Sequence, residues 1–386
     1  MLRLINFCHL LALFVTLRAV RRLVVRAGDY NAFALVASCF PVLYFFSFLY
    51  YTDVGSALFV MMSYYYSLCN KPGLSAFAGA IAVLYRQTNI VWVVFIAALR
   101  VYESLRVSRM SWIQRGFVHE NSDGCISSEQ YDIYVVHLLK DTCLAAFWIP
   151  DIWMSAMQKI LCDVFGYVLV VASFLTFLIW NSGSFTVGDH GAHRPCFHAV
   201  QLCYLSAFTT GFGWPYCLNI MRLSSFTYRV RRHKFRTATL AVAIISIIYF
   251  TTYEHPYLLA DNRHYTFYIW RRWFRSHWLF KYALVPLYGH GLYVMFLSRF
   301  MSRQPAFYSI AFTIATALVV VPNRLLEFRY FVIPYLFWRC HVWESRMRWL
   351  QYEILTYLSV NAFTLYMFLF RPFVWPHESG VQRFMW

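Results

Sequence analysis

The sequence predicts an all-α, polytopic membrane protein. Of its 386 residues, 60% are hydrophobic, 21% are aromatic and only 13% are charged, whereas a soluble domain carries roughly a quarter charged residues. Apolar runs close to the roughly 20 residues that cross a bilayer recur along the whole chain. Short groups of arginine and lysine separate these runs, as is typical of the loops that set the orientation of membrane helices.

We expect about twelve membrane segments in one membrane domain that covers residues 1–386. Several segments are shorter than a full crossing, so we expect some of them to be broken or re-entrant within the protein. No internal repeat and no nucleotide-binding glycine-rich motif is visible. The approximate segments are 2–17, 32–51, 55–68, 74–86, 89–104, 162–181, 198–220, 237–253, 280–298, 305–322, 330–338 and 352–370.

The first apolar run sets the predicted orientation. It could be read as a signal peptide, but no small-residue cleavage site follows it. Instead, RAVRRLVVR places four arginines after it, against Arg3 before it. The positive-inside bias therefore directs its end into the cytosol, and alternation places RVRRHKFR (229–236) there too. A protein that began at Met1 would have to translocate its N-terminus, so we expect a segment upstream of it.

Charge and cysteine content exclude two other classes. The net charge of +17 is spread over short clusters between apolar runs, so it does not indicate a nucleic-acid-binding domain. The ten cysteines include no CxxC pair and no His/Cys spacing suited to zinc. The longest polar stretch, about 105–160, is expected to be a cytosolic loop.

Polar residues gather on the opposite, non-cytosolic face. Arginine there runs against the positive-inside bias and requires partners. Each arginine could pair internally, for example Arg263 with Asp261 or Arg329 with Glu327. As a set, however, the cations outnumber the acids, which suits an anionic lipid headgroup, above all a phosphate. The arginines are Arg86, Arg263, Arg271, Arg324 and Arg329, within RQTN, ADNRHYTFYIWRR and VPNRLLEFRYF.

A second cluster combines Asp189 with His190, His193 and His198. Histidine and aspartate could bind a metal, but the spacing is not distinctive, and hydrogen bonding to sugar or phosphate is the favoured reading. Asp53 and Asp189 are the carboxylates best placed to act as a base or to hold hydroxyls. Either could equally cap a helix, which is the commoner use of an aspartate at a helix end.

Six stretches of the sequence carry a resemblance when they are taken together. In chain order they are LYFFSFLYYTDVGS, LYRQTNIVWVVF, VGDHGAH, YLLADNRHYTFYIWRR, LLEFRYFVIPY and QRFMW. Together they resemble one family, the eukaryotic dolichyl-phosphate-glucose α-1,2-glucosyltransferases. The resemblance extends from Met1 to Trp386 and is weakest over 105–160. It implies a GT-C-type fold in the endoplasmic reticulum membrane with its active site facing the lumen.

The resemblance also implies a reaction. Glucose passes from dolichyl phosphate glucose to the diglucosylated high-mannose oligosaccharide on dolichyl diphosphate, as the third and terminal glucose of the N-glycan precursor. The implied mechanism is an inverting single displacement. A carboxylate takes the proton of the attacking hydroxyl, and cations stabilise the departing phosphate. The resemblance implies no nucleotide, redox cofactor or metal.

Under this resemblance the site residues receive roles. Asp189 and Asp53 are weak candidates for the catalytic carboxylate. Family members begin with a further helix and an acidic luminal loop, so we expect the principal base upstream of Met1 and a truncated sequence here. Arg263, His264, Arg271, Arg86 and Arg329 are expected to bind the donor phosphate. Asp261, Asn262, His193, Gln87, Asn89 and Glu327 are expected to bind sugar or acceptor.

Two other classes remain open at this point. A transporter or channel would also carry charges near the membrane, although it would usually show paired repeats with broken helices, and none is visible. A non-catalytic membrane partner is the third possibility. Binding of dolichyl phosphate glucose with transfer would distinguish the enzyme from both.

Overall fold

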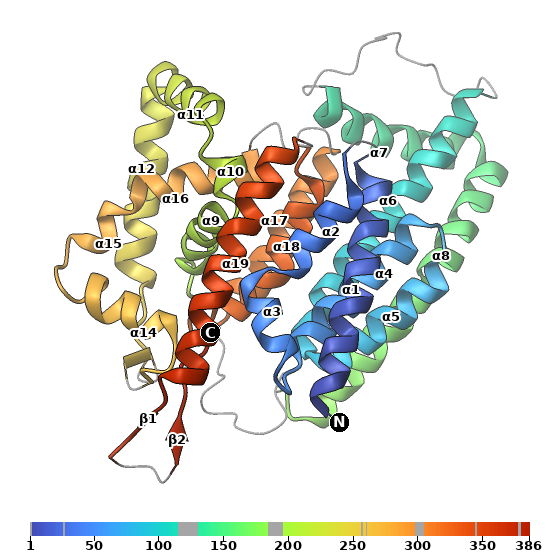
Figure 1. Cartoon of the computed structure of the whole chain (residues 1–386). Coiled ribbons are helices and arrows are strands. Elements are labelled where there is room, and N and C mark those ends of the chain that lie inside the picture. The colour runs from blue at the N-terminus through green and yellow to red at the C-terminus, as the bar shows by residue number, and fades with distance from the viewer. Residues whose placement is uncertain are drawn as a thin grey trace. The chain divides into compact units, whose positions relative to one another are not determined.

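Helices make up nearly all of the regular structure of the chain (Figure 1). Within the residues that the structure describes, strands occur only as β1 (Phe373–Val374) and β2 (Val381–Gln382), which pair antiparallel as a hairpin. The prediction of an all-α chain is therefore confirmed. The computed structural model describes residues 2–25, 28–114, 130–183, 196–255, 258–259, 261–297, 305–343, 346–376 and 380–386.

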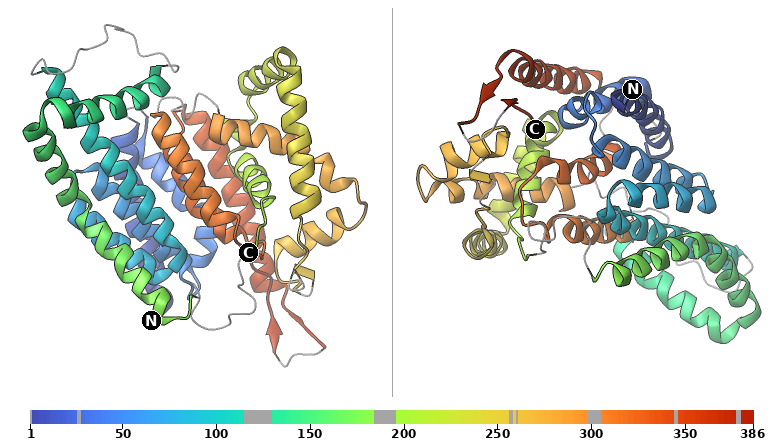
Figure 2. Two further views of the ribbon diagram at one scale, coloured as in Figure 1. Left: turned by 180° about the vertical axis from the view of Figure 1, so that it is seen from behind. Right: turned by 90° about the horizontal axis from the view of Figure 1, so that it is seen from below.

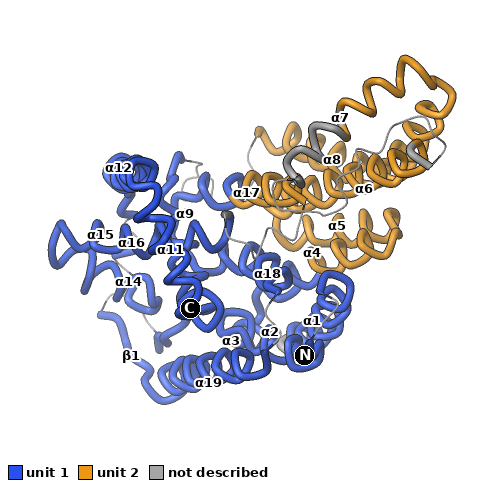
Figure 3. The backbone as a smooth tube through the Cα atoms, turned by 90° about the horizontal axis from the view of Figure 1, so that it is seen from above, with its two compact units in different colours: residues 1–58, 188–300, 317–386 blue, residues 59–187, 301–316 orange. Residues whose placement is uncertain are grey.

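The chain divides into two compact units (Figure 3). Each unit combines segments that lie far apart in the sequence, so its helices are held by long-range packing. The single membrane domain expected from the sequence stays a prediction. Unit 1 comprises residues 1–58, 188–300 and 317–386, and unit 2 comprises residues 59–187 and 301–316.

In unit 1, the N-terminal helices α1, α2 and α3 pack on one another, and α2 and α3 also pack on α19. Helix α16 packs against α9 and α12, and α12 and α16 lie side by side in Figures 1 and 2. The π-helical segments η2 and η3 interrupt the helices between α12 and α17. The elements are α1 (Leu2–Val24), α2 (Tyr30–Ser38), α3 (Pro41–Ser47), α9 (Gln201–Phe212), α10 (Trp214–Cys217), α11 (Ile220–Arg232), α12 (Lys234–Thr251), α14 (Tyr265–Ile269), η2 (Trp270–Phe274), α15 (Phe280–Ala283), α16 (Val285–Leu292), η3 (Tyr293–Leu297), η4 (Phe328–Phe331), α18 (Val332–His341) and α19 (Met347–Phe370).

In unit 2, helix α8 packs along α5 and α6. A buried hydroxyl chain joins three helices, because Tyr167 donates to Ser75 Oγ at 2.6 Å and Ser75 donates to the Ser63 carbonyl at 2.6 Å. The elements are α4 (Asp53–Leu68), α5 (Pro72–Tyr85), η1 (Gln87–Asn89), α6 (Ile90–Gln114), α7 (Gln130–Trp148), α8 (Pro150–Trp180) and α17 (Ala306–Val320), of which α4 and α17 extend into unit 1.

Among the described residues, four helices are long and apolar enough to cross a membrane, so the chain is a membrane protein. Helices α2 and α3 are together long and apolar enough to form a fifth span, but the pair bends by 67° at a short break between them. Two shorter apolar helices, α5 and α17, add to the apolar structure. The predicted number of about twelve segments stays a prediction. The four spans are Leu4–Val24, Pro150–Trp180, Lys234–Thr251 and Met347–Phe370.

The apolar stretch 280–298, expected as one segment, is divided into α15, α16 and η3. Pro286 lies in the first turn of α16. Proline has no N–H, so it cannot continue the hydrogen-bond ladder of the preceding helix. This stretch belongs to the broken segments that the sequence led us to expect.

The stretch 105–160, expected as a loop, is mostly helical where it is described. Helix α6 reaches Gln114, and α7 and α8 occupy residues 130–148 and 150–180. Its charges are satisfied between helices: Arg109 Nε donates to Asp141 at 2.6 Å, and both side chains are largely buried. The polar composition misled the sequence-based prediction, because pairing between helices cannot be read from a local pattern.

Unit 1 also contains a fully buried ion pair, which sequence analysis did not identify. Arg339 donates to Glu353 through Nε at 2.9 Å and through Nη2 at 2.7 Å. The hydroxyls of Tyr216 and Tyr357 each donate to Glu353 at 2.9 Å, and Tyr335 lies 2.5 Å from the Tyr357 hydroxyl. We call these five residues the sealed cluster. It connects α10, α18 and α19.

A second arginine extends this buried polar region. Arg21 donates through Nη1 to the carbonyls of Cys340 at 2.8 Å and Val342 at 2.6 Å. Arg21 and Arg339 each lie 4.9 Å from the ring centre of Phe33. Arg21 belongs to the RAVRRLVVR group that the sequence analysis assigned to the cytosolic side, and the structure buries Arg21 and Arg339 at 3% and 1% exposure. Arg21 links α1 to the end of α18, and Arg339 links α18 to α19.

Candidate functional site

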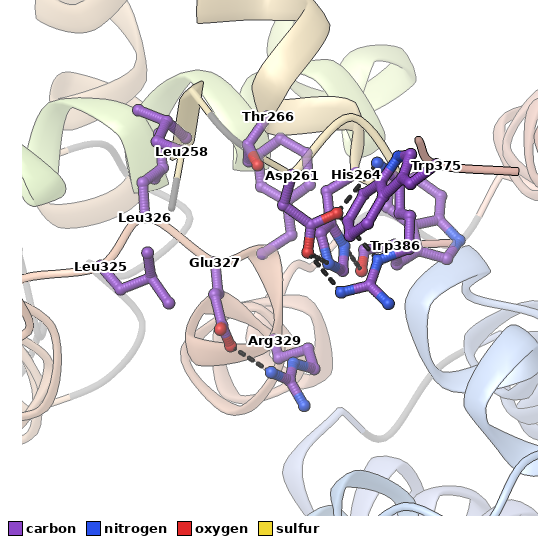
Figure 4. Close-up of a pocket in the computed structure, with 12 residues that line it drawn as sticks. Leu258, Asp261, His264, Thr266, Leu325, Leu326, Glu327, Arg329, Trp375 and Trp386 are labelled. Carbon is purple, nitrogen blue, oxygen red and sulfur yellow. Dashed lines mark hydrogen bonds and ion pairs between the residues drawn. The ribbon is translucent and has the colours of Figure 1, made fainter. Parts of the chain in front are cut away.

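The described part of unit 1 contains a cavity of about 430 Å³, built from three parts of the chain (Figure 4). The first surrounds the start of α14, the second leads into η4, and the third follows α19. Charged groups and indole rings share the wall with leucines, which suits a ligand with a polar head and an apolar tail. The lining residues are Leu258, Asp261, Arg263, His264, Thr266, Leu325, Leu326, Glu327, Phe328, Arg329, Trp375 and Trp386.

Asp261 and Arg263 form a bidentate ion pair in this wall. Arg263 Nε donates to Asp261 Oδ1 at 2.9 Å, and Nη2 donates to Oδ2 at 2.8 Å. The backbone N–H of Arg263 also donates to Asp261 Oδ1 at 3.0 Å, which is the turn that aspartate forms with the amide two residues ahead. The local sequence therefore builds the pair, and 33% of the Arg263 side chain remains exposed.

Hydrogen bonding sets the charge state of Asp261. Burial alone would raise the pKa of this carboxyl, but hydrogen bonds from His264 and Arg263 outweigh burial and hold the pKa well below its usual range. Asp261 is therefore ionised at neutral pH. A carboxylate with so low a pKa is a weak base, so it is suited to accepting hydrogen bonds from hydroxyls and cations.

Both ring nitrogens of His264 face an oxygen atom. Nδ1 lies 2.6 Å from the main-chain oxygen of Trp386, and Nε2 lies 3.3 Å from Asp261 Oδ2. A main-chain oxygen and an ionised carboxylate only accept hydrogen bonds. The ring therefore lies between the Trp386 main chain and the Asp261 carboxylate.

Arg329 lies beside two carboxylates. It donates through Nη2 to Glu327, which also lines the cavity, and its Nη1 lies 3.8 Å from Asp53 Oδ2. Its guanidinium lies 5.6 Å from the ring centres of Phe46 and Tyr51. Burial would lower the pKa of Arg329, but the carboxylates of Glu327 and Asp53 raise it above its usual value. Arg329 therefore stays charged.

The structure brings five of the predicted site residues to one cavity. Their proposed roles stay predictions, because the contacts show position rather than catalysis. Asp53 is 4% exposed at the start of α4 and reaches the site through Arg329. Asn262 accepts a hydrogen bond from Trp375 Nε1 at 2.7 Å, next to the cavity wall. The five residues are Asp261, Arg263, His264, Glu327 and Arg329.

Other predicted residues lie elsewhere. Arg271 is exposed in η2, with its guanidinium 5.6 Å from the ring centre of Phe267. Arg86, Gln87 and Asn89 belong to unit 2, at the end of α5 and in η1. Asn89 is buried, and its Nδ2 donates to the Ala82 carbonyl at 2.7 Å.

The predicted cluster around Asp189 is only partly described. Asp189, His190 and His193 lie outside the described residues. His198 is buried, and its Nδ1 lies 3.1 Å from the Asn323 carbonyl. Arg324 lies over the ring of Tyr253 at 4.6 Å. In the part of the chain that the structure describes, no group of three His, Cys, Asp or Glu side chains could hold a metal ion.

Sequence analysis missed the two tryptophans of the cavity wall. Trp375 lies 4.8 Å from the Arg263 guanidinium, measured to the ring centre. Trp386 packs at 4.4 Å on Tyr265, again between ring centres. The stretch QRFMW was noticed only for its resemblance. A signal was present, because two tryptophans follow the last apolar run within a short polar stretch.

Comparison with known proteins gives a consistent result. The model of the DIE2/ALG10 family matches residues 1–340. A Homo sapiens protein named Dol-P-Glc:Glc(2)Man(9)GlcNAc(2)-PP-Dol alpha-1,2-glucosyltransferase is 33% identical over 352 residues, 91% of this chain and 72% of that protein. A protein of the same name from Arabidopsis thaliana is 34% identical over 92% of this chain and 75% of its own length. One from Yarrowia lipolytica is 27% identical over 93% and 76%. No solved structure matches the chain.

Proposed function

The chain belongs to the DIE2/ALG10 family, and from this premise we propose the function of its pocket. The chain is a glucosyltransferase that uses Dol-P-Glc as donor and Glc(2)Man(9)GlcNAc(2)-PP-Dol as acceptor, and it forms an α-1,2 linkage. The observation that carries this conclusion is the one name shared by relatives from an animal, a plant and a fungus, each matched over more than nine tenths of this chain.

We place the donor's glucosyl phosphate in the cavity of unit 1. The guanidiniums of Arg263 and Arg329 lie beside the carboxylates Asp261 and Glu327 respectively. We propose that these two guanidiniums and the His264 ring donate charge-assisted hydrogen bonds to the phosphodiester. When the phosphate departs it gains negative charge, and preorganised cations stabilise that charge most.

The rest of the wall suits the other parts of the donor. Asp261 and Glu327 can accept hydrogen bonds from sugar hydroxyls, and the indole faces of Trp375 and Trp386 can pack on a pyranose ring. Leucines of the lining offer an apolar surface to the first isoprene units. The cavity thus combines the three chemistries that a polyprenyl phosphate sugar requires.

Transfer is proposed as a single displacement with inversion. The acceptor hydroxyl attacks the anomeric carbon, its proton passes to a carboxylate, and the bond from the anomeric carbon to the phosphate oxygen breaks. We propose Asp189 and Asp53 for holding sugar hydroxyls rather than as the principal base, and Asp53 Oδ2 also lies 3.8 Å from Arg329 Nη1. The proposed roles of Arg271 and Arg86 at the phosphate, and of Asn262, His193, Gln87 and Asn89 at sugar hydroxyls, stand beside these.

We further propose an endoplasmic reticulum membrane location, a GT-C-type fold of about twelve segments and a luminal site. The topology can be tested with engineered glycosylation sequons. A sequon within residues 183–194 should be modified, and one within residues 222–236 should not be. The reverse pattern would place every proposed site residue in the wrong compartment.

The activity is tested in a cell that lacks its own enzyme and accumulates diglucosylated precursor. Expression of this protein should end the accumulation. Purified protein with Dol-P-Glc and acceptor should release dolichyl phosphate and lengthen the oligosaccharide by one hexose. Persistent accumulation in cells that contain the protein in the membrane would refute the assignment.

A further inference from the structure

Trp386 lines the cavity and ends a short stretch, residues 381–386, that lies beyond residues 1–340, which the family model matches. We call this stretch the 381–386 segment. It starts with strand β2 and ends at Trp386. Its apolar side chains Phe384 and Trp386 are buried, at 5% and 8% exposure. The segment is therefore anchored in unit 1 rather than extended away from it.

Main-chain groups of the segment hold the stretch that carries the phosphate-site candidates. The Met385 N–H donates to the Arg263 carbonyl at 2.8 Å, and His264 and Met385 form a parallel bridge. The main-chain oxygen of Trp386 accepts from His264 Nδ1 at 2.6 Å. Two neighbouring residues of the site are thus each fixed by a neighbouring residue of the segment.

Side chains add to this hold. Gln382 Oε1 accepts a hydrogen bond from Arg263 Nη1 at 3.0 Å. The rings of Phe384 and Trp386 pack on Tyr265, the first residue of α14, with ring centres 4.6 Å and 4.4 Å away. The guanidinium of Arg263 is therefore held from two sides: Asp261 accepts from Nε and Nη2, and Gln382 accepts from Nη1.

The contact at His264 has a chemical consequence. A main-chain oxygen at Nδ1 requires that this nitrogen carry the proton. Nε2 is then the nitrogen that faces Asp261 and the cavity wall. Without the Trp386 oxygen, the ring could rotate about its side-chain bonds or take the other tautomer, and its donor would no longer be fixed.

We propose that the 381–386 segment positions the glucosyl-transfer site. Its Met385 N–H, its Trp386 oxygen and its Gln382 amide hold Arg263 and His264 in the orientation in which they meet the donor phosphate. This inference rests on the proposed function of the cavity. The Gln382 side chain and the main-chain groups of Met385 and Trp386 are positioning groups, because they act through Arg263 and His264.

The decisive comparison is Met385→Pro against Met385→Ala in the full-length protein. Both variants lose the methionine side chain, but only proline removes the N–H that donates to Arg263. We expect Met385→Ala to keep wild-type kinetics. Met385→Pro should lower kcat/KM for Dol-P-Glc by about 2- to 10-fold, as for one net hydrogen bond, and the acceptor KM should stay unchanged.

A second pair tests the side-chain contact without a change of backbone. Gln382→Ala removes the acceptor for Arg263, whereas Val381→Ala alters the preceding residue of the same strand, whose side chain is 61% exposed. Gln382→Ala should raise the donor KM, and Gln382→Glu should restore it because it still accepts. Equal kinetics for Gln382→Ala and Val381→Ala would contradict the proposal.

Hydrogen exchange of backbone amides 261–266 separates this proposal from the proposed function, because it needs no activity. Met385→Pro should speed the exchange of amides 261–266 at least several-fold relative to Met385→Ala. Exchange of the amides in the four membrane spans should stay unchanged. Unchanged exchange overturns the proposal. Faster exchange with unchanged kcat/KM overturns it too, since the stretch would then lie outside the site. If the wild type transfers no glucose, the proposed function fails. The hydrogen-exchange rates then show by themselves whether the 381–386 segment holds residues 261–266.

Discussion

The sealed cluster and the cavity wall of unit 1 are built around the same unit of chemistry, an arginine that binds a carboxylate bidentately. In the sealed cluster, the side chains of Arg339 and Glu353 are 2% and 1% exposed. In the cavity wall, those of Arg263 and Asp261 are 33% and 21% exposed. The first pair is surrounded by tyrosine hydroxyls on packed helices, and the second by a turn and the 381–386 segment.

This difference separates a structural pair from a binding pair. A fully desolvated pair cannot exchange partners, because each charge would be left alone at a high free-energy cost. A partly exposed pair loses less free energy when a guanidinium N–H turns to a new anion, because water solvates the charges. The exposed fraction, rather than the ion pair itself, therefore distinguishes the residues suited to meet a phosphate from those that hold helices together.

The largest effect is expected in the sealed cluster. Glu353→Ala leaves Arg339 charged and uncompensated, and should lower the free energy of unfolding by about 3–5 kcal/mol. Thermal unfolding of purified protein would measure this. The double variant Glu353→Leu, Arg339→Met should recover much of the loss, since it removes both charges. Glu103→Ala, at an exposed pair with Arg106, is the control and should cost less than about 1 kcal/mol. Similar losses for both carboxylates would remove the distinction.

The next largest effect is expected at the partly exposed pair of Arg263 and Asp261. Arg263→Ala should leave the protein folded but lower turnover or donor affinity by about ten- to a hundredfold, the value of a charge-assisted hydrogen bond to phosphate. Kinetics with varied Dol-P-Glc would measure it, with exposed Arg371→Ala as the control. If turnover and donor affinity both stay near wild type, Arg263 is structural, and the phosphate site moves to Arg324 and Arg329.

A smaller effect follows from the depressed pKa of Asp261. Its contribution to stability is fully present above the ordinary pKa of an aspartate, 3.8, and is lost as pH falls towards the lower folded-state value. In a His264→Asn background no imidazole titrates at this position, while the hydrogen bonds from Arg263 still lower the Asp261 pKa. There, Asp261→Asn should lower the unfolding temperature equally at pH 7 and pH 5, and the difference between the two unfolding temperatures should narrow only below about pH 4. A difference that stays constant down to about pH 3 would show that the Asp261 pKa is not depressed.

The smallest effect is expected at Arg271, which is exposed and does not line the cavity as described. Arg271→Ala should change donor KM by about fivefold at most, because an exposed cation attracts an anion through solvent by no more than about 1 kcal/mol. The change should shrink as salt is added. A loss equal to that of Arg263→Ala would extend the phosphate site to η2.

Much of the cavity lining could be predicted, because its arginines lie where the positive-inside bias predicts few cations. Arginine on the non-cytosolic side of a membrane protein is unexpected, and this led to ADNRHYTFYIWRR and VPNRLLEFRYF. The structure joins these two stretches in one cavity, through Asp261, Arg263, His264, Glu327 and Arg329. The helical membrane class followed from composition alone.

Other features could not be predicted, because they depend on contacts between distant residues. Glu353 lies within an apolar run, and only the fold shows that Arg339 and three tyrosines surround it. The helical character of 105–160 was hidden because its charges pair between helices. Trp386 contacts His264 across 122 residues of sequence, and no local pattern indicates this contact.

The walls of the cavity come from residues far apart in the sequence, so they are synthesised at different times. Residues 258–266 are translated well before residue 386, yet the cavity includes both. While the ribosome still makes α19, the nascent chain already carries Arg263 and His264, but their partners Met385 and Trp386 do not yet exist. The cavity that we propose for the donor can therefore be completed only after α19 has been made. A chain interrupted between α19 and residue 386 would insert into the bilayer with this pocket open on one side.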